Sequence, residues 1–115
     1  MSEHHRLIIL GAGTAGLMAY KEATRHTDDI LLIDPGPLGT TCARVGCMPS
    51  KVLLQIARDF HTGHRLAGRR LTRDTPPTPD GVAVMEHVRR LRDNFASGPI
   101  KRVEKLGKRG RYIKG

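Results

Sequence analysis

The sequence predicts an α/β fold in which an N-terminal βαβ unit is followed by helices. Two short aliphatic runs, 6–10 and 30–33, have the composition of strands that are buried on both faces of a parallel sheet. A stretch that reads as a helix, 17–26, lies between them, and further helical patterns follow residue 50. At 115 residues the chain amounts to at most one ordinary domain.

The first strand leads into a glycine-rich turn, G-A-G-T-A-G at residues 11–16. In a strand-turn-helix unit, the first glycine of G-x-G-x-x-G permits the tight turn and the second lets the backbone approach a pyrophosphate. The third lets the helix pack close to the strand. Asp34 ends the second strand, where a carboxylate can accept hydrogen bonds from ribose hydroxyls. We therefore predict a Rossmann-like dinucleotide-binding unit over 6–34, with binding residues Gly11, Gly13, Gly16 and Asp34.

The acid at residue 34 also bears on which dinucleotide binds. A carboxylate disfavours a 2′-phosphate, so FAD or NAD fits better than NADP. The motif alone does not separate FAD from NAD, and a glycine turn of purely structural role is the alternative.

Residues 39–51, G-T-T-C-A-R-V-G-C-M-P-S-K, contain both cysteines of the chain. Residues five apart on an ideal helix have Cα atoms roughly 8–9 Å apart, whereas a disulfide requires less than about 7 Å. Cys42 and Cys47 can bridge only if the backbone between them leaves the helix, which Gly46 allows. So short a loop makes an inefficient structural staple, while a strained and easily reduced disulfide suits electron transfer.

The histidines offer the two thiols no metal-binding partners. A zinc site would need two further ligands at characteristic spacing. We therefore expect no metal site, and we interpret the histidines as surface residues: His4, His5, His26, His61, His64 and His87.

Charge is unevenly distributed along the chain. Residues 1–50 carry four Lys and Arg against five Asp and Glu, and residues 51–115 carry sixteen against six, so the chain has a net charge of +9. Such asymmetry indicates either a polyanionic partner or a piece of a larger protein. Aromatic residues are only 3% of the chain, and no nucleic-acid reader motif occurs, so we expect neither nucleic acid nor membrane as a partner. The apolar run 7–19 is too short to cross a bilayer, and we expect a cytoplasmic location.

The glycine motif, the acid-ended strand and the cysteine segment together resemble the class I pyridine nucleotide-disulfide oxidoreductases, which are FAD-dependent flavoproteins. The resemblance covers the whole chain and is strongest over 7–60. The sequence of residues 42–51 is most similar to the N-terminal part of bacterial dihydrolipoamide dehydrogenases. Residues 81–90 also resemble the helical segment that follows in those enzymes.

The resemblance implies a role for each matching residue. The glycines and Asp34 would hold the ADP half of FAD, and Thr41 would lie by the pyrophosphate. Cys42 would be the outer thiol that attacks a substrate disulfide, and Cys47 the inner thiol that contacts the flavin. Lys51 would lie near flavin N5, where a cation stabilises the reduced flavin. Substrates would be small dithiols or disulfides such as dihydrolipoamide, with NAD(H) as co-substrate and a homodimer as the assembly.

The chain is several-fold shorter than these family members. We therefore expect the N-terminal part of an FAD-binding domain over 1–115, without NAD(P)-binding and dimerisation domains, and inactive by itself. The alternatives are a fragment of a mercuric or glutathione-type reductase, a non-catalytic FAD-binding remnant, or a basic interaction module.

Two helices are expected after the cysteine segment, over about 50–64 and 81–96. Asp80 can cap the second one, and the intervening Arg-, Thr- and Pro-rich stretch reads as a loop. Their apolar stripes are interpreted as packing surfaces: Leu53, Ile56, Ala57 and Phe60 in the first, and Val84, Val88, Leu91 and Phe95 in the second.

Overall fold

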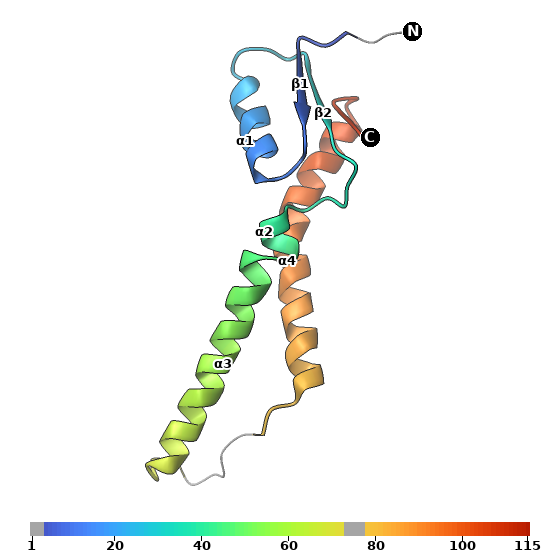
Figure 1. The fold of residues 1–115 in the computed structure, drawn as a ribbon. Helices are drawn as coiled ribbons and strands as arrows, with labels where there is room; N and C mark the ends of the chain where they lie inside the picture. The colour runs from blue at the N-terminus through green and yellow to red at the C-terminus, as the bar shows by residue number, and fades with distance from the viewer. Residues whose placement is uncertain (1–3, 73–77) are drawn as a thin grey trace.

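The structure, a computed structural model, describes residues 4–72 and 78–115. Its elements in chain order are β1 (Leu7–Leu10), α1 (Thr14–Ala23), β2 (Ile30–Ile33), α2 (Thr41–Arg44), α3 (Cys47–Gly68), α4 (Gly81–Gly107) and β3 (Tyr112–Ile113). Figure 1 shows α1 beside a small sheet, with α3 and α4 running away from it as a long hairpin. The molecule is accordingly elongated, with extents of 72 × 25 × 17 Å.

The sheet is parallel, and its strand order is β1-β2-β3. Leu7 lies opposite Ile30 in the first pairing, and Leu32 lies opposite Tyr112 in the second. Parallel strands joined through a crossover helix are the βαβ arrangement. The predicted α/β fold class is therefore confirmed, and β3 is a further strand that the sequence pattern did not indicate.

The core lies on one face of this sheet, beneath α1 and the C-terminal end of α4. Its buried residues are Ala12, Leu17, Tyr20, Ile30, Leu32, Val103 and Leu106. Side chains alternate between the two faces of a strand, so Ile8, Leu10 and Ile113 lie on the opposite face. They are 49%, 78% and 48% exposed, whereas Leu31, which pairs with Ile8 on the same face, is buried. This apolar face of the sheet is therefore only partly covered in the described structure.

Both long helices extend beyond the ranges expected from the sequence. Helix α3 begins at Cys47 rather than near residue 50, because Pro49 lies in its first turn, where no backbone N–H is needed. The predicted Asp80 cap of α4 is confirmed, since its carboxylate accepts hydrogen bonds from Val82 and Ala83. This helix continues through Pro99 to Gly107 instead of ending near residue 96.

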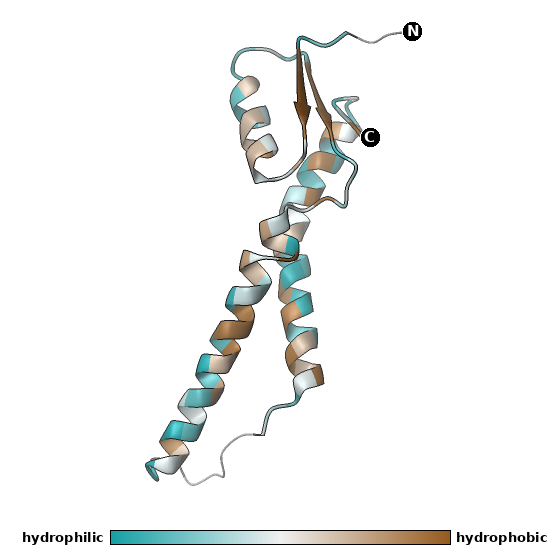
Figure 2. Ribbon diagram, viewed as in Figure 1, coloured by the Kyte–Doolittle hydropathy of each residue, from teal (hydrophilic) through white to brown (hydrophobic). Residues whose placement is uncertain are grey.

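Packing accounts for the extra turns of α4. Ala96, Val103 and Leu106 are buried along it, on both sides of the proline. Figure 2 shows β1 and β2 as continuous hydrophobic segments, whereas α3 and α4 alternate between hydrophobic and hydrophilic residues. Within residues 4–72 and 78–115, no helix combines the length and the apolar character needed to cross a membrane.

Candidate functional site

The glycine turn places its three glycines in three different environments. Gly11 has φ +98°, a conformation that other residues rarely adopt. A Cβ added to Gly16 would lie 1.7 Å from the carbonyl oxygen of Gly11, so α1 packs directly against the turn. Gly13 caps α1 with an extended backbone, and nothing lies within 4 Å of where its Cβ would be. The backbone is therefore open to an approaching ligand at Gly13.

Asp34 joins the two loops at the carboxyl end of the sheet. Its Oδ2 accepts a hydrogen bond of 2.6 Å from the backbone N–H of Ala12, and its Oδ1 accepts one of 2.6 Å from Gly36. The sequence predicted a ribose-binding carboxylate and did not indicate this bracing role. A carboxylate oxygen has two lone pairs, so each oxygen keeps one for a ligand.

Tyr112 supports the same residue from the far end of the chain. Its hydroxyl donates a hydrogen bond of 3.2 Å to the backbone carbonyl of Asp34, across 78 positions of sequence. No local sequence signal could have indicated this contact, because it depends on the pairing of β3 with β2.

A pocket of about 290 Å³ opens between the glycine turn and the loop that follows β2. Its lining residues are Ala12, Gly13, Asp34, Pro35, Gly36, Pro37, Leu38, Gly39, Thr40, Thr41 and Arg44. It thus brings together Gly13, Asp34 and Thr41, three of the residues predicted from the sequence to bind the cofactor. The backbone N–H groups at the start of α1 also favour an anion at this position.

The segment that carries Thr41 is held by its neighbour Thr40. Thr40 has φ +56°, and its hydroxyl oxygen accepts a hydrogen bond of 3.2 Å from the backbone N–H of Ala43. This side chain caps α2, so it fixes the start of the short helix in which Cys42 lies. Sequence reasoning assigned Thr41 and missed Thr40.

The two cysteines lie on either side of a break between helices. Cys42 is half-buried in α2, and Cys47 is the exposed first residue of α3. The backbone leaves the helical conformation at Val45 and Gly46, as the spacing argument requires for a bridge. Both thiols are free in this structure.

Cys47 influences the protonation of Cys42. The pKa of Cys42 is raised above its ordinary value of 9.0, chiefly by its hydrogen bond with the Cys47 thiol, then by burial and by the charge of Cys47. The positive charge of Lys51 acts in the opposite direction and lowers the pKa of Cys42. Cys42 therefore holds its proton to a higher pH than an isolated thiol does. Lys51 is exposed on α3, four residues beyond Cys47.

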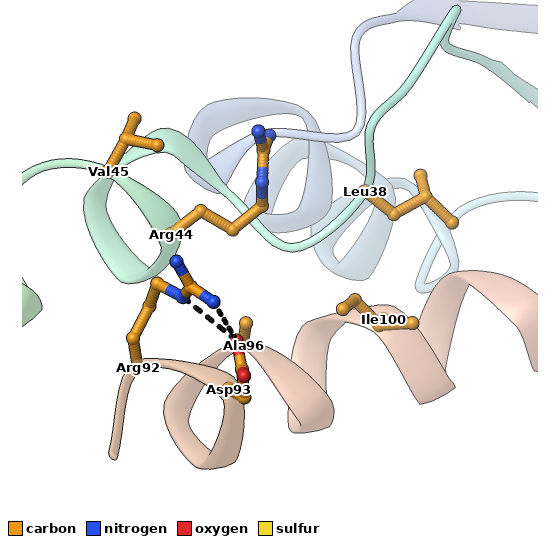
Figure 3. A pocket seen from close by; sticks show the side chains of 7 residues that line it. All are labelled: Leu38, Arg44, Val45, Arg92, Asp93, Ala96 and Ile100. Atoms are coloured by element: carbon orange, nitrogen blue, oxygen red, sulfur yellow. Dashed lines mark hydrogen bonds and ion pairs between the residues drawn. The ribbon is translucent and has the colours of Figure 1, made fainter. Parts of the chain in front are cut away.

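Two further pockets flank the cysteine segment. One, of about 250 Å³, is lined by Thr14, Leu17, Met18, Thr40, Cys42, Ala43, Met48, Pro99 and Arg102. The other, of about 460 Å³, is lined by Leu38, Arg44, Val45, Arg92, Asp93, Ala96 and Ile100 (Figure 3). The first reaches from the start of α1 to Cys42, so space for a ligand adjoins one residue of the pair.

Metal ligands do not gather in the part of the chain that the structure describes. None of its His, Cys, Asp and Glu residues form a group of three or more that could hold an ion. The described surroundings of Cys42 are a second thiol and a pocket lined by residues of α1, α2, α3 and α4.

This chain is similar to a known protein family and to several known proteins. Residues 5–113 match the family model described as pyridine nucleotide-disulphide oxidoreductase. A mercuric reductase of Serratia marcescens is 30% identical over 101 residues, which are 88% of this chain and 20% of that protein. A dihydrolipoyl dehydrogenase of Bacillus subtilis is 47% identical over 51 residues, which are 44% of this chain and 11% of that protein.

A dihydrolipoyl dehydrogenase of Mycoplasma genitalium is similar to the same degree, 46% identical over 52 residues, or 45% of this chain and 11% of that protein. The chain spans a fifth or less of the length of these relatives. The family match itself extends from the start of β1 to the end of β3 and includes the glycine turn and both cysteines. The chain belongs to the pyridine nucleotide-disulphide oxidoreductase family.

Proposed function

We propose that this chain is the part of an FAD-dependent dithiol/disulfide oxidoreductase that holds the ADP half of FAD and carries the redox-active pair. The observation that supports this best is that the pocket-lining segment runs directly into the cysteine segment. Thr41 lines the pocket at the glycine turn, and the next residue is Cys42. A dinucleotide bound at the turn would therefore lie beside the segment that carries the thiols.

The residues of the pocket suit such a cofactor. Gly13 leaves the backbone accessible, the start of α1 favours the negative pyrophosphate, and the Asp34 oxygens keep lone pairs for ribose hydroxyls. Thr41 would contact the pyrophosphate, and Lys51 would lie near flavin N5. When bound, FAD would supply a two-electron acceptor for the reduced thiol pair.

The oxidised pair would accept two electrons from a dithiol substrate. A substrate thiolate attacks the sulfur of Cys42, which breaks the Cys42–Cys47 bond and releases the Cys47 thiolate. The second substrate thiolate then attacks the substrate sulfur of this mixed disulfide and releases Cys42. The substrate leaves as a disulfide, and the pair is reduced by the same two electrons. In the reverse direction Cys42 is the attacking thiol.

Attack by Cys42 on a substrate disulfide requires that the thiol first lose its proton. Because the pKa of Cys42 is raised by its hydrogen bond with Cys47, its attack on a disulfide calls for a base that takes the thiol proton. In the family that the sequence resembles, a His–Glu pair from another domain serves this purpose. We infer that catalysis at this pair depends on such a group, with NAD(H) as the final electron carrier.

Dihydrolipoamide is the proposed substrate, because residues 42–51 resemble bacterial dihydrolipoyl dehydrogenases and two such enzymes are 47% and 46% identical to this chain over 44% and 45% of its length. A mercuric reductase activity is the second candidate. It is favoured by the length of that match, which covers 88% of this chain. Either activity would use the Cys42–Cys47 pair, so the same test of the thiols applies to both proposals.

The test is the redox state of the cysteines. After mild oxidation, mass spectrometry should show the loss of two hydrogens per chain and a peptide linked by Cys42–Cys47, which dihydrolipoamide converts back to two thiols. Cys42→Ser and Cys47→Ser are the controls and should form no intramolecular bridge. Two free thiols in the oxidised parent chain would contradict the proposed function.

A further inference from the structure

Arg44 lies at the wall between two pockets. It lines the candidate cofactor pocket together with Gly13 and Thr41, and it also lines the larger pocket in Figure 3. Residues three apart on a helix share a face, so Thr41 and Arg44 present neighbouring side chains from α2. The cofactor-binding residues that the sequence indicated did not include Arg44.

The loop after β2 fixes the course of the Arg44 side chain. A Cβ at Gly39 would lie 3.1 Å from Cδ of Arg44, so the glycine leaves room for the aliphatic stem to cross the loop. At the far end, Nη1 donates a hydrogen bond of 2.9 Å to the carbonyl oxygen of Pro37. The guanidinium is therefore held at the rim of the cofactor pocket while most of its donors remain unused.

The charge of Arg44 is uncompensated among residues 4–72 and 78–115, where it has no carboxylate within ion-pair distance. Arg92, across the larger pocket, differs in this respect because it pairs with Asp93 at 2.8 Å. Figure 3 shows the Arg44 guanidinium extending away from that pair. The acid within the cofactor pocket, Asp34, is occupied by backbone N–H groups on both oxygens.

We infer that Arg44 is a phosphate-binding residue of the cofactor pocket, one that contacts the pyrophosphate of the dinucleotide beside Thr41. The inference rests on the proposed function. A fixed guanidinium with free N–H donors forms strong, directional hydrogen bonds with phosphate oxygens. It complements the turn before α1, whose residues Ala12 and Gly13 line the same pocket and lead into the helix start that favours an anion.

The experiment compares binding of ADP and of adenosine to the 115-residue chain by calorimetry or equilibrium dialysis. Arg44→Gln should weaken ADP binding by about tenfold or more and leave adenosine binding unchanged, because only ADP carries phosphate. Arg44→Lys should recover part of the loss, since it restores the charge without the planar fork. Arg92→Gln removes the same charge from a residue outside the cofactor pocket, and it should bind ADP like the parent chain.

Each alternative result has a distinct meaning. ADP binding that Arg44→Gln leaves unchanged would overturn the inference and spare the proposed function. An equal loss of ADP and adenosine binding would also overturn it, because the arginine would then be shaping the pocket. Equal losses in Arg44→Gln and Arg92→Gln would show a general charge effect and no contact. Absence of ADP binding by the parent chain would overturn the inference and the proposed function together.

Discussion

The backbone N–H of Ala12 donates a hydrogen bond of 2.6 Å to Oδ2 of Asp34, which ties the glycine turn after β1 to the end of β2. The other oxygen of the same carboxylate accepts from Gly36. The acid that sequence motifs associate with a ribose is thus also a structural brace. Its loss should be visible in the unbound protein, before any cofactor is considered.

Asp34→Asn should lower the free energy of unfolding. One hydrogen bond to the charged carboxylate is replaced by a weaker one to the amide oxygen, and the other is lost because its backbone donor faces an amide NH₂, so we expect a loss of about 1–3 kcal/mol. Urea unfolding followed by circular dichroism measures this. Asp59→Asn is the matched control on the exposed surface of α3, where Asp59 accepts a hydrogen bond from Gln55, and it should change stability by less than about 0.5 kcal/mol. Equal stability of the two variants would contradict the bracing role.

Gly16→Ala should destabilise the fold more than any other glycine substitution in the turn. Its Cβ would lie 1.7 Å from the Gly11 carbonyl oxygen, a backbone atom that cannot move without displacing α1 or β1. Overpacking of this kind costs about 1–3 kcal/mol or more. Gly13→Ala is the comparison, because space is open there and its stability should stay close to that of the parent chain. Thermal unfolding that ranks the two variants the other way would refute this assignment of the glycines.

Alkylation of Cys42 should have a pH midpoint above 9.0, and Cys47→Ser should bring it down toward that value. The Cys47 thiol is the main cause of the raised pKa of Cys42, through its hydrogen bond and its charge. A serine hydroxyl carries no such charge and is a different hydrogen-bond partner for Cys42, so the pKa of Cys42 should fall. A raised folded-state pKa means that this group stabilises the fold below 9.0, and that the contribution is lost as the pH rises through the folded-state value. Rates of iodoacetamide modification, resolved by peptide mass spectrometry, report the midpoint. An unchanged midpoint in Cys47→Ser would disprove the coupling.

Lys51→Met should move the same midpoint further upward. The lysine charge lowers the pKa of Cys42, so its removal leaves only the hydrogen bond from the Cys47 backbone to oppose the effects of the Cys47 thiol and of burial. Because the side chain is exposed, screening by salt should shrink the shift. Lys101→Met, on α4, removes an equal charge from another exposed site and serves as the control. A downward shift in Lys51→Met, or the same shift in the control, would exclude a direct effect of Lys51.

Local patterns in the sequence determined the βαβ unit and the break between the cysteines. The strands were evident because 7–10 and 30–33 are continuous aliphatic runs, and Gly46 indicated the break because five-residue spacing cannot bridge on one helix. Helix α4 was underestimated, since Pro99 signals a helix end locally while burial of Val103 and Leu106 sustains the helix.

Contacts between segments far apart in the chain could not be predicted from local sequence patterns. Tyr112 meets Asp34 only because β3 pairs with β2, and Arg44 reaches Pro37 only because Gly39 lets its stem cross the loop. The same limit applies to the thiols. Their spacing indicated that a bridge is possible, but the raised pKa of Cys42 follows from the position that α2 gives its side chain.

The central claim is that the pocket at the glycine turn binds the dinucleotide of a flavoprotein. Titration of FAD into the purified 115-residue chain, followed by flavin fluorescence, tests it most directly. We predict saturable 1:1 binding that Gly13→Ala weakens by at least about tenfold, because a Cβ there obstructs the pyrophosphate. Gly81→Ala, at the far end of α4, should bind like the parent chain. No saturable binding, or equal binding by the parent chain and Gly13→Ala, would contradict the claim.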